Sequence, residues 1–353
     1  MSQPSATIPA RTIGIDISDK ESTFAVLDAA GEWVEEGKFL TTLEGTIDAL
    51  EERGPCRVIL ESSTHSSWMA STISSLGHEV IVANPRRLAL ISKSKKKTDR
   101  NDARTLAKVG RLDRELLSPV WVRPMSHLAI RSLLRARKQL VNMRTSLINL
   151  VRSEAKVQGV RLPECSSRVF AKRVTDQLPD LLRPGLAPAL QVHQNLTDHI
   201  DAYDKEIERL CKVDFPETQV LRQVAGVGAL VALTFVTSIV DPRRFKDSRS
   251  VGAFAGLAPA VFQSGQSDPT LRITKEGDRE LRTLLVTAAT YVMRRSSPDS
   301  ALKRAGMRIA GRGQPRDRAR GRVAVARKLA VLLHRLWLTG EVYEPLRGVD
   351  ATT

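Results

Sequence analysis

Two short apolar runs on either side of one helical segment place the tightest limit on the fold of this chain. Residues 56–62 read CRVILES and residues 79–85 read EVIVANP. Nearly continuous apolar runs of this length are typical of strands that are buried on both faces of a sheet. The segment between them predicts a helix over 66–76 that ends at Gly77. Strand, helix and strand in this order predict an α/β domain.

The preceding residues add an antiparallel part to the same sheet. Residues 11–28 read RTIGIDISDKESTFAVLD, which predicts two strands joined by a tight polar turn at 18–20. The other predicted elements are a third strand near 35–40 and helices over 43–53 and 98–112. The order βββαβαβα predicts a mixed α/β sheet domain over residues 11–115.

Apolar residues repeat with a heptad period in the middle of the chain. Leu133, Leu140 and Leu147 recur every seven residues within a predicted helix over 126–157. A second set, spaced four and three in turn within residues 186–212, is Leu196, Ile200, Tyr203, Ile207 and Leu210. This spacing predicts a coiled-coil seam, and the sequence fits pairing within one chain as well as pairing across a dimer. Residues 158–185 predict a helix and a break that contains Pro and Gly.

The C-terminal part predicts a mainly helical domain. Gly226 and Gly228 lie between two apolar helical stretches, as in a helix-hairpin-helix turn, where glycines let backbone amides approach a phosphate. Plain helix-turn packing explains the same pattern equally well. The predicted parts of the chain are a disordered tail (1–10), the sheet domain (11–115), a linker with coiled-coil helices (116–215), the helical domain (216–345) and a second tail (346–353).

The charge of the chain indicates its partners. The formal net charge is +16, and eleven Lys or Arg residues fall between Lys303 and Arg335 with a single acid, Asp317. A charge of this size favours nucleic acid as the partner, with an anionic membrane surface as the weaker candidate. No run approaches the roughly 18 apolar residues of a membrane-spanning helix. We therefore expect a nucleic-acid-binding protein without a membrane partner.

Cysteine and histidine usage argues against a zinc site. The three cysteines and six histidines are scattered and form no metal-ligand spacing. Unpaired cysteines fit a reducing compartment, so we expect a cytoplasmic, nucleoid-associated protein in a prokaryote.

Four acidic residues stand at the predicted ends of sheet elements. Asp16 interrupts the first strand, Glu61 closes the strand VILE, and Asp99 and Asp102 share one helix face directly after a lysine-rich run. Taken singly, Asp99 and Asp102 are explained by helix capping and Glu61 by an ion pair at a strand end. Taken together, the four carboxylates would repel one another by about 1 to 4 kcal/mol per close pair unless cations separate them. Oxygen-only ligands fit Mg²⁺ or Mn²⁺, and two such ions could act together on a phosphodiester.

The order of these acids resembles that of the ribonuclease H-like nucleases, the RuvC junction resolvases in particular. The stretch KTDRNDARTLA is similar to a more specific family, the DEDD transposases of the insertion-sequence-one-ten family, whose relatives include the Piv DNA invertase. The resemblance implies that Asp16, Glu61, Asp99 and Asp102 bind the catalytic metal ions.

The resemblance continues in the C-terminal domain. The family's Pro-Gly-Ile-Gly-like turn corresponds to AGVG at 225–228, where alanine replaces the proline. The other matching motifs are Arg244-Phe245, Ala255-Gly256-Leu257-Ala258-Pro259, Ser264-Gly265, Ile273-Thr274-Lys275-Glu276-Gly277 and Leu281-Arg282. The middle helices are similar in character only.

The resemblance also implies a second catalytic group. Ser264 matches the serine that attacks DNA in this family and forms a covalent protein–DNA intermediate, although Ser267 lies nearby and a Ser-Gly pair in a polar loop is usually only a turn. A free hydroxyl is a poor nucleophile, so it needs metal-bound oxygens or Lys275 to activate it. The family further implies composite active sites in a tetramer and guidance by a noncoding bridge RNA that pairs with donor and target DNA.

The basic residues near these motifs are candidate nucleic-acid contacts. They are Lys93, Lys95, Lys96, Lys97, Arg100, Arg104, Arg272, Lys275, Arg279 and Arg282, together with the amides at Gly226 and Gly228. Three hypotheses follow: a Mg²⁺-dependent transposase that uses a serine, a hydrolytic RuvC-like nuclease that needs only the four acids, and a nucleic-acid-binding protein without activity. Retention of the four acids argues against the third, and the C-terminal motifs argue against the second.

Overall fold

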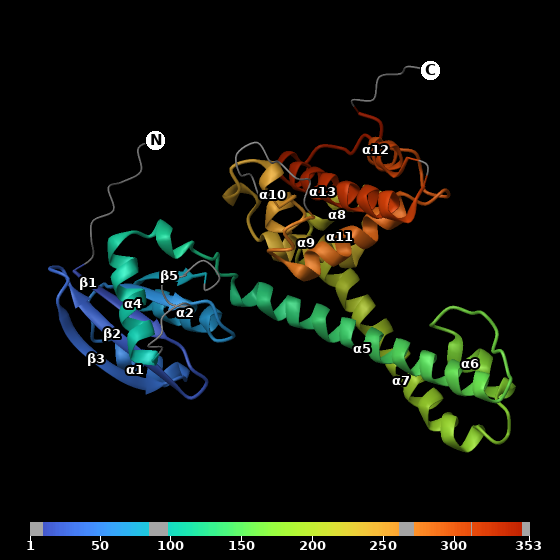
Figure 1. The fold of residues 1–353 in the computed structure, drawn as a ribbon, viewed down its shortest axis with the longest axis horizontal. Helices are drawn as coiled ribbons and strands as arrows, with labels where there is room; N and C mark the ends of the chain where they lie inside the picture. Colours follow the sequence, from blue (N-terminus) through green and yellow to red (C-terminus); the bar gives the residue numbers. More distant parts are fainter. Residues whose placement is uncertain (1–9, 85–97, 261–271, 312, 348–353) are drawn as a thin grey trace. The chain divides into compact units, whose positions relative to one another are not determined.

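The computed structural model of the chain describes residues 10–84, 98–260, 272–311 and 313–347 (Figure 1). It contains two compact units, Met1–Leu128 and Ala129–Thr353. Each unit is described by itself below.

The first unit is built on a mixed five-stranded sheet in the order β3-β2-β1-β4-β5. Its strands are β1 (Arg11–Asp16), β2 (Glu21–Asp28), β3 (Trp33–Leu40), β4 (Arg57–Glu61) and β5 (Glu79–Ala83). The first three strands pair antiparallel, whereas β4 pairs parallel with both β1 and β5. The element order βββαβαβα is confirmed, and this is a ribonuclease H-like sheet.

Helices cover both faces of this sheet. Helices α1 (Leu43–Leu50) and α2 (Ser66–Ser75) pack on one face, where Ile13, Ile15 and Leu60 belong to the core. Helix α4 (Asp99–Leu112) packs on the other face with Ile59 and Ile81. The central strands β1 and β4 are therefore buried on both sides, which explains their continuous apolar sequences. A short 3-10 helix, η1 (Glu115–Leu117), follows α4.

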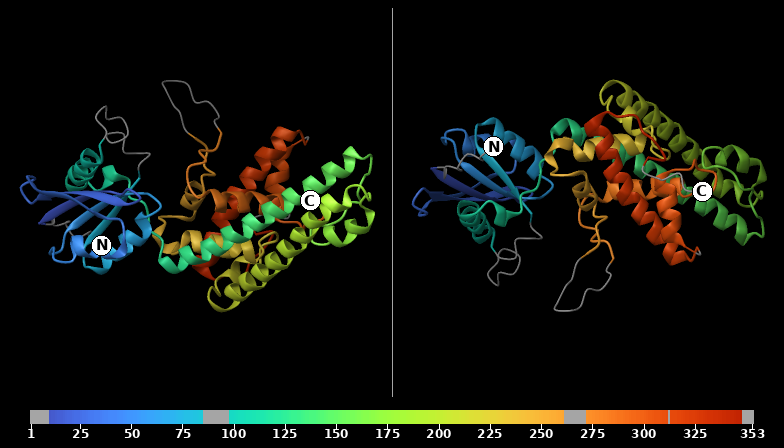
Figure 2. Two further views of the ribbon diagram at one scale, coloured as in Figure 1. Left: turned by 90° about the horizontal axis from the view of Figure 1, so that it is seen from below. Right: turned by 90° about the horizontal axis from the view of Figure 1, so that it is seen from above.

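Helices α5 (Met125–Val157) and α7 (Arg183–Val213) form an antiparallel pair within the chain (Figures 1 and 2). Arg137 of α5 donates a hydrogen bond of 2.7 Å to Asp204 of α7. Leu134 packs with Ile207 near one end of the pair, and Val151 packs with Leu190 near the other. The intramolecular hairpin, one of the two pairings that the heptad pattern allows, is thus formed.

The segment between these helices has both of its predicted features. It contains α6 (Phe170–Val174) and the 3-10 helix η2 (Thr175–Gln177), as expected of a further helix. The predicted break is present too, because residues 158–169, with Gly159 and Pro163, form no helix, whereas Pro184 and Gly185 lie in the first turn of α7. Proline is tolerated there since the first backbone amides of a helix have no partner within the helix.

The C-terminal helices share one hydrophobic core. They are α8 (Thr218–Leu221), α9 (Ala229–Ile239), α10 (Ser248–Phe254), α11 (Arg279–Val292), α12 (Ala301–Ala310) and α13 (Pro315–Thr339), with the 3-10 helix η3 (Pro242–Arg244) between α9 and α10. Helix α9 is buried on almost all sides, and Phe235 and Leu329 are fully buried in this core. The region is mainly helical, as predicted. None of the described helices has the length and apolar character needed to cross a membrane.

Candidate functional site

The carboxyl ends of β1 and β4 bring two of the predicted acids to one edge of the sheet. The strands pair parallel, with Gly14 opposite Ile59 and Ile15 opposite Leu60. Asp16 and Glu61 are the next residue on each strand and are both partly buried. Side chains alternate along a strand, so Asp16 projects to the same face as Gly14, and Glu61 to the same face as Ile59.

That face is the one covered by α4. A Cβ atom added to Gly14 would lie 2.1 Å from the carbonyl oxygen of Ala103, and one added to Gly110 would lie 2.3 Å from Cγ1 of Ile59. At the other end of α4, Arg57 at the start of β4 donates a hydrogen bond to the carbonyl of Gly110, and Arg111 donates to the carbonyl of Ala29, next to the partner of Arg11. The helix therefore runs antiparallel to β1, and its first turn lies toward the carboxyl edge of the sheet. Asp16 and Glu61 project toward the same edge as the first turn of α4.

The first turn of α4 carries the other two acids. Thr98 is the N-cap, and its hydroxyl accepts a hydrogen bond of 3.3 Å from the amide of Asn101. Because Thr98 caps the helix, capping does not account for Asp102, whose side chain is only 5% exposed. Asp99 is exposed. Burial on the first turn of a helix fixes the Asp102 carboxylate at this edge of the sheet, so Asp102 is the strongest candidate ligand.

The chemical type of the four candidate ligands fits a hard divalent cation. The set consists of carboxylates alone, which Mg²⁺ and Mn²⁺ prefer. Among the residues that the structure describes, no three His, Cys, Asp or Glu side chains come close enough together to hold a metal ion. The backbone thus brings the acids to one edge, and binding of an ion would require the side chains to turn toward one another.

Two predicted phosphate ligands in this unit have partners within the chain. Arg100 and Arg104 both form ion pairs with Glu36 on β3, and the Arg104 guanidinium also lies over the ring of Trp33. Phosphate binding by them would have to compete with Glu36. Lys93, Lys95, Lys96 and Lys97 lie outside the described residues.

In the second unit, two of the predicted motifs meet at a short two-stranded neck. Pro259 and Ile273 form an antiparallel bridge, and the amide of Ala260 donates to the carbonyl of Arg272 at 2.9 Å. The neck closes the segment that carries Ser264 and Ser267, which lie outside the described residues. Ser264 follows Ala260 by four positions in the chain.

The glycines of these motifs allow a close approach of backbones. Gly256 has a φ of +67°, and an added Cβ would lie 2.4 Å from the carbonyl of Glu276; at Gly277, φ is +120° and an added Cβ would lie 2.0 Å from the carbonyl of Phe254. Arg282 donates a hydrogen bond of 3.0 Å to the carbonyl of Ala255. Arg282 thus has a structural role at the neck, and its phosphate contact stays a prediction, as does that of the exposed Arg279.

The two glycines of the predicted hairpin turn differ from each other. Gly226 has a φ of +86°, and an added Cβ would lie 3.0 Å from the carbonyl of Ala288 in α11, so this glycine is needed for packing. Gly228 is the N-cap residue of α9 and has open space beside its Cα. An exposed amide at a helix N-terminus can bind a phosphate, so Gly228 remains the better candidate.

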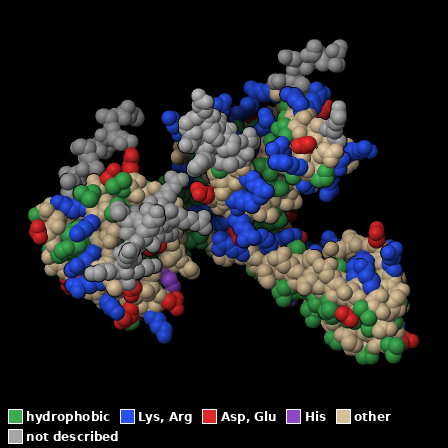
Figure 3. Space-filling model, viewed as in Figure 1, with side chains coloured by type: hydrophobic (Ala, Val, Ile, Leu, Met, Phe, Trp, Pro, Cys, Tyr) green, Lys and Arg blue, Asp and Glu red, His purple; other side chains and the backbone are tan. Residues whose placement is uncertain are grey.

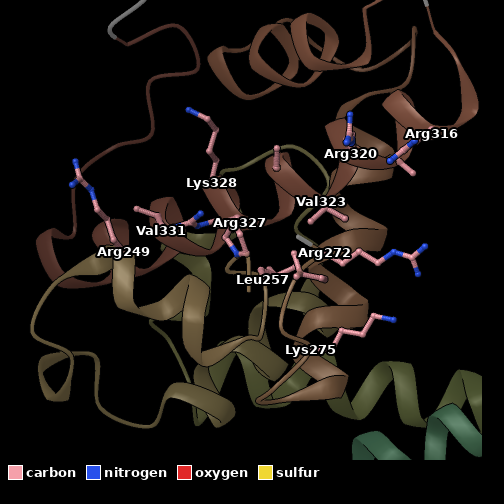
Figure 4. Close-up of a pocket in the computed structure, with 14 residues that line it drawn as sticks. Arg249, Leu257, Arg272, Lys275, Arg316, Arg320, Val323, Arg327, Lys328 and Val331 are labelled. Carbon is pink, nitrogen blue, oxygen red and sulfur yellow. The ribbon is translucent and has the colours of Figure 1, made fainter. Parts of the chain in front are cut away.

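The sequence analysis missed a groove in the second unit. A cavity of about 1220 Å³ lies between α13 and the neck and has seven Lys or Arg side chains in its lining (Figure 4). Five of them were not among the predicted contacts: Arg249, Arg316, Arg320, Arg327 and Lys328. Figure 3 shows Lys and Arg side chains gathered over these C-terminal helices. Four of these residues, Arg316, Arg320, Arg327 and Lys328, follow one another along α13 at intervals of 4, 7 and 1 residues, and this spacing could have indicated a single helix face.

Comparisons with known proteins match both ends of the chain. Residues 13–155 match a transposase model of the DEDD type named for IS110, and residues 218–305 match a model described as "Transposase IS116/IS110/IS902 family". The first segment contains the acidic edge, the second contains the neck, and together they cover more than half of the chain.

Curated relatives span most of the chain. The transposase for insertion sequence element IS1111A of Coxiella burnetii is 28% identical over 297 residues, covering 81% of this chain and 79% of the relative. The transposase for IS1328 of Yersinia enterocolitica is 29% identical, covering 68% and 72%. The pilin gene-inverting protein of Moraxella bovis is 27% identical, covering 67% and 66%.

Proposed function

Because the chain belongs to the IS116/IS110/IS902 family of transposases, we propose that it cuts and rejoins DNA with a metal site at the acidic edge and with Ser264 as the nucleophile. The family makes it an enzyme that cleaves and transfers DNA, and its DEDD domain implies the use of a divalent metal. The burial of Asp102 on the helix turn that lies toward the edge where β1 and β4 end in acids is the observation that supports this site most strongly.

Asp16, Glu61, Asp99 and Asp102 would hold the metal ions, which we propose to be two Mg²⁺ or Mn²⁺ ions. Bound ions would neutralise charge that develops on the phosphate and lower the pKa of an attacking hydroxyl. Asp102 contributes a fixed ligand because it is buried on a rigid helix, whereas the exposed Asp99 has more freedom. We therefore expect Asp102 to tolerate replacement less well than Asp99.

Ser264 would attack the phosphodiester in a transesterification. Its Oγ forms a bond to phosphorus, the bond from phosphorus to the bridging oxygen of the strand breaks, and the leaving oxygen takes up a proton in place of the one that serine loses. The energy of the phosphodiester is retained, so a hydroxyl of another strand can reverse the attack and rejoin the DNA. Lys275, exposed at the base of the segment that carries Ser264, would contact the phosphate.

We propose that two copies of the chain associate through α5. One face of α5 packs within the chain, but Leu140, Met143, Leu147 and Leu150 form an adjacent heptad stripe. Met143 is 44% exposed and Leu150 is 45% exposed. A sustained stripe of this kind favours a second helix as its partner. Association of two such dimers in a tetramer could then bring one subunit's serine to the acids of another.

Guidance by a bridge RNA forms the last part of the proposal. The charge of +16 exceeds what one cleavage site needs. A protein that contacts about 6–10 phosphates loses roughly 10³–10⁵ in affinity when salt rises from 50 to 200 mM, whatever the sequence. Base pairing between RNA and DNA would supply the sequence choice, while the protein reads backbone and shape.

The serine is tested by a search for a covalent adduct. The chain is incubated with Mg²⁺, with RNA transcribed from its element and with plasmid DNA that carries the element's flanks, and DNA bound to denatured protein is measured. Ser264→Ala should abolish the adduct, and Ser267→Ala, the matched control, should retain it. Adduct formation by Ser264→Ala would refute the nucleophile assignment.

The same reaction tests the metal site and the hydrolytic alternative. Asp102→Asn should remove strand cleavage, while Asp113→Asn, a control beyond the end of α4, should not. Nicked DNA without any adduct in the unsubstituted protein would favour the RuvC-like nuclease instead. Cleavage that continues in EDTA would exclude the metal proposal.

The partners are tested separately. Omission of the RNA should abolish recombination, and unchanged products without RNA would contradict guidance. Leu147→Glu with Leu150→Glu should reduce the mass measured by light scattering to that of a smaller assembly. An unchanged mass would show that α5 is not the interface.

A further inference from the structure

The groove between α13 and the neck combines two kinds of surface. Its rim is cationic, with Arg316 and Arg320 from α13 on the same side as Arg272 and Lys275 from the neck region, and Lys328 on the other side (Figure 4). Its floor is apolar, formed by Leu257, Ile273, Val323 and Val331. None of the described lining residues is acidic. The groove therefore suits an anion that also carries an apolar surface.

The cations of the rim are not neutralised within the described part of the chain. Only Arg320 has a carboxylate partner there, Asp317 at 3.8 Å, and this pair is exposed. Elsewhere in the same unit arginines are paired closely, as Arg222 is with Glu208 at 2.9 Å. A set of like charges that lack partners raises the local potential and favours a polyanion.

The sequence of α13 places this groove on one helix face. Residues 316, 320, 323, 327 and 331 recur at three- and four-residue intervals and line the groove, whereas Val325 and Leu329 are fully buried in the core behind it. Small residues, Ala319 and Ala324, lie between the cations and leave the space open. Helix α13 lies outside both segments that match the family models.

We propose that this groove binds unpaired DNA nucleotides next to the segment that carries Ser264, with the bases on the apolar floor and the phosphates at the cationic rim. This inference rests on the proposed function. Duplex DNA presents phosphates, sugars and base edges but no base faces, because its bases are stacked, so it would leave the apolar floor unused. Unpaired strands offer both surfaces, and guanidinium planes such as that of Arg327 can stack on bases.

The lining favours DNA over RNA. Recognition of RNA uses hydrogen bonds to the 2′-hydroxyl. The described side chains of the lining are apolar or cationic, so they can donate a hydrogen bond to that group but none can accept one from it. Deoxyribose, which lacks the hydroxyl, fits the apolar floor without loss of a hydrogen bond.

The test measures binding of the full chain in EDTA, where cleavage is suppressed. Fluorescein-labelled probes of one length are compared by anisotropy: a DNA single strand, the same strand with three adjacent abasic sites, its duplex and the matching RNA strand. We expect the intact single strand to bind about tenfold more tightly than the abasic strand, in line with base stacking in other single-strand sites.

Two double variants assign this difference to the groove. Arg320→Gln with Lys328→Gln should lower the base-dependent difference to about twofold or less and reduce the slope of log affinity against log salt by about 1.4. Arg308→Gln with Arg318→Gln removes the same charge from exposed positions outside the lining and should keep the tenfold difference. Thermal melts of both variants establish that they fold. As a second measurement, a 5-iodouracil strand crosslinked to the unsubstituted protein should modify peptides from 316–331.

Three results would overturn the proposal: equal binding of intact and abasic strands, an undiminished difference in the groove variant, or tighter binding of the duplex. Tighter binding of RNA than of DNA would overturn the assignment to DNA. Binding in EDTA tests this inference, and adduct formation in Mg²⁺ tests the serine mechanism. The two measurements are independent, so a failure of one proposal does not imply a failure of the other.

Discussion

Gly14 offers a direct test of whether contact between β1 and α4 positions the metal ligands. Replacement by alanine would put a Cβ atom 2.1 Å from the carbonyl oxygen of Ala103 and 2.5 Å from the amide nitrogen of Ala107. Both atoms belong to the backbone of α4, so rotation of a side chain cannot relieve the overlap. The helix must move away from the strand by about 1 Å to restore an ordinary contact.

Two effects of Gly14→Ala are expected from this displacement. Overpacking in a buried site costs about 1–3 kcal/mol, and we expect the upper end because the helix moves as a unit. The shift also separates Asp102 from the strand-end acids, and a misplacement of about 1 Å can reduce a rate roughly 100-fold. Urea unfolding measures the first effect, and Mg²⁺-dependent strand cleavage under folding conditions measures the second.

Gly54→Ala is the matched control. Gly54 lies in the same unit, and an added Cβ there would have no atom within 4 Å. This variant should keep its stability within about 0.5 kcal/mol and retain full cleavage. If Gly14→Ala behaved as Gly54→Ala does in both assays, the reasoning that the β1–α4 contact sets the acidic edge would be refuted.

Other parts of the chain give three further predictions. Arg131→Met removes a buried guanidinium that donates hydrogen bonds to Asp278 and Glu280, and it should destabilise the second unit by about 3–5 kcal/mol in urea unfolding. The exposed control Arg135→Met should cost less than about 1 kcal/mol. Equal losses of stability in the two variants would contradict the importance of the buried pairing. Burial, with the Arg144 cation nearby, lowers the pKa of His193, so the unfolded chain binds a proton before the folded chain does as pH falls below about 6.5. The free energy of unfolding, measured relative to that of His193→Gln, should then decline by up to about 1.4 kcal/mol per pH unit. A difference between the two proteins that does not change with pH would exclude the effect. Addition of Mg²⁺ should raise the melting temperature of the unsubstituted chain but not of Asp102→Asn, and equal shifts would show that the ion binds elsewhere.

The sequence predicted the sheet domain well because its signals are local. Continuous apolar runs identify β4 and β5, and alternation with a polar turn identifies β1 and β2. Handedness and connection rules then leave few ways to arrange such elements. The pairing of β1 with β4, which is compatible with these rules, brings Asp16 and Glu61 to the same edge of the sheet.

Other features depended on the tertiary structure because several arrangements fit the same local pattern. A heptad repeat does not distinguish an intramolecular partner from an intermolecular one, and the Arg137–Asp204 contact decided for the hairpin within the chain. Capping explained Asp99 from the sequence alone, and the structure selects Thr98 as the N-cap of α4.

By itself, the sequence determined the elements, the acids and the excess of positive charge, since these follow from residue identity and local spacing. Only the tertiary structure decided which cations are neutralised and which remain available. Arg100, Arg104 and Arg282 have partners within the chain, whereas the cations along α13 surround a groove. The physical reason is that an ion pair or a cavity wall is made by residues distant in sequence, and no local pattern records how they meet.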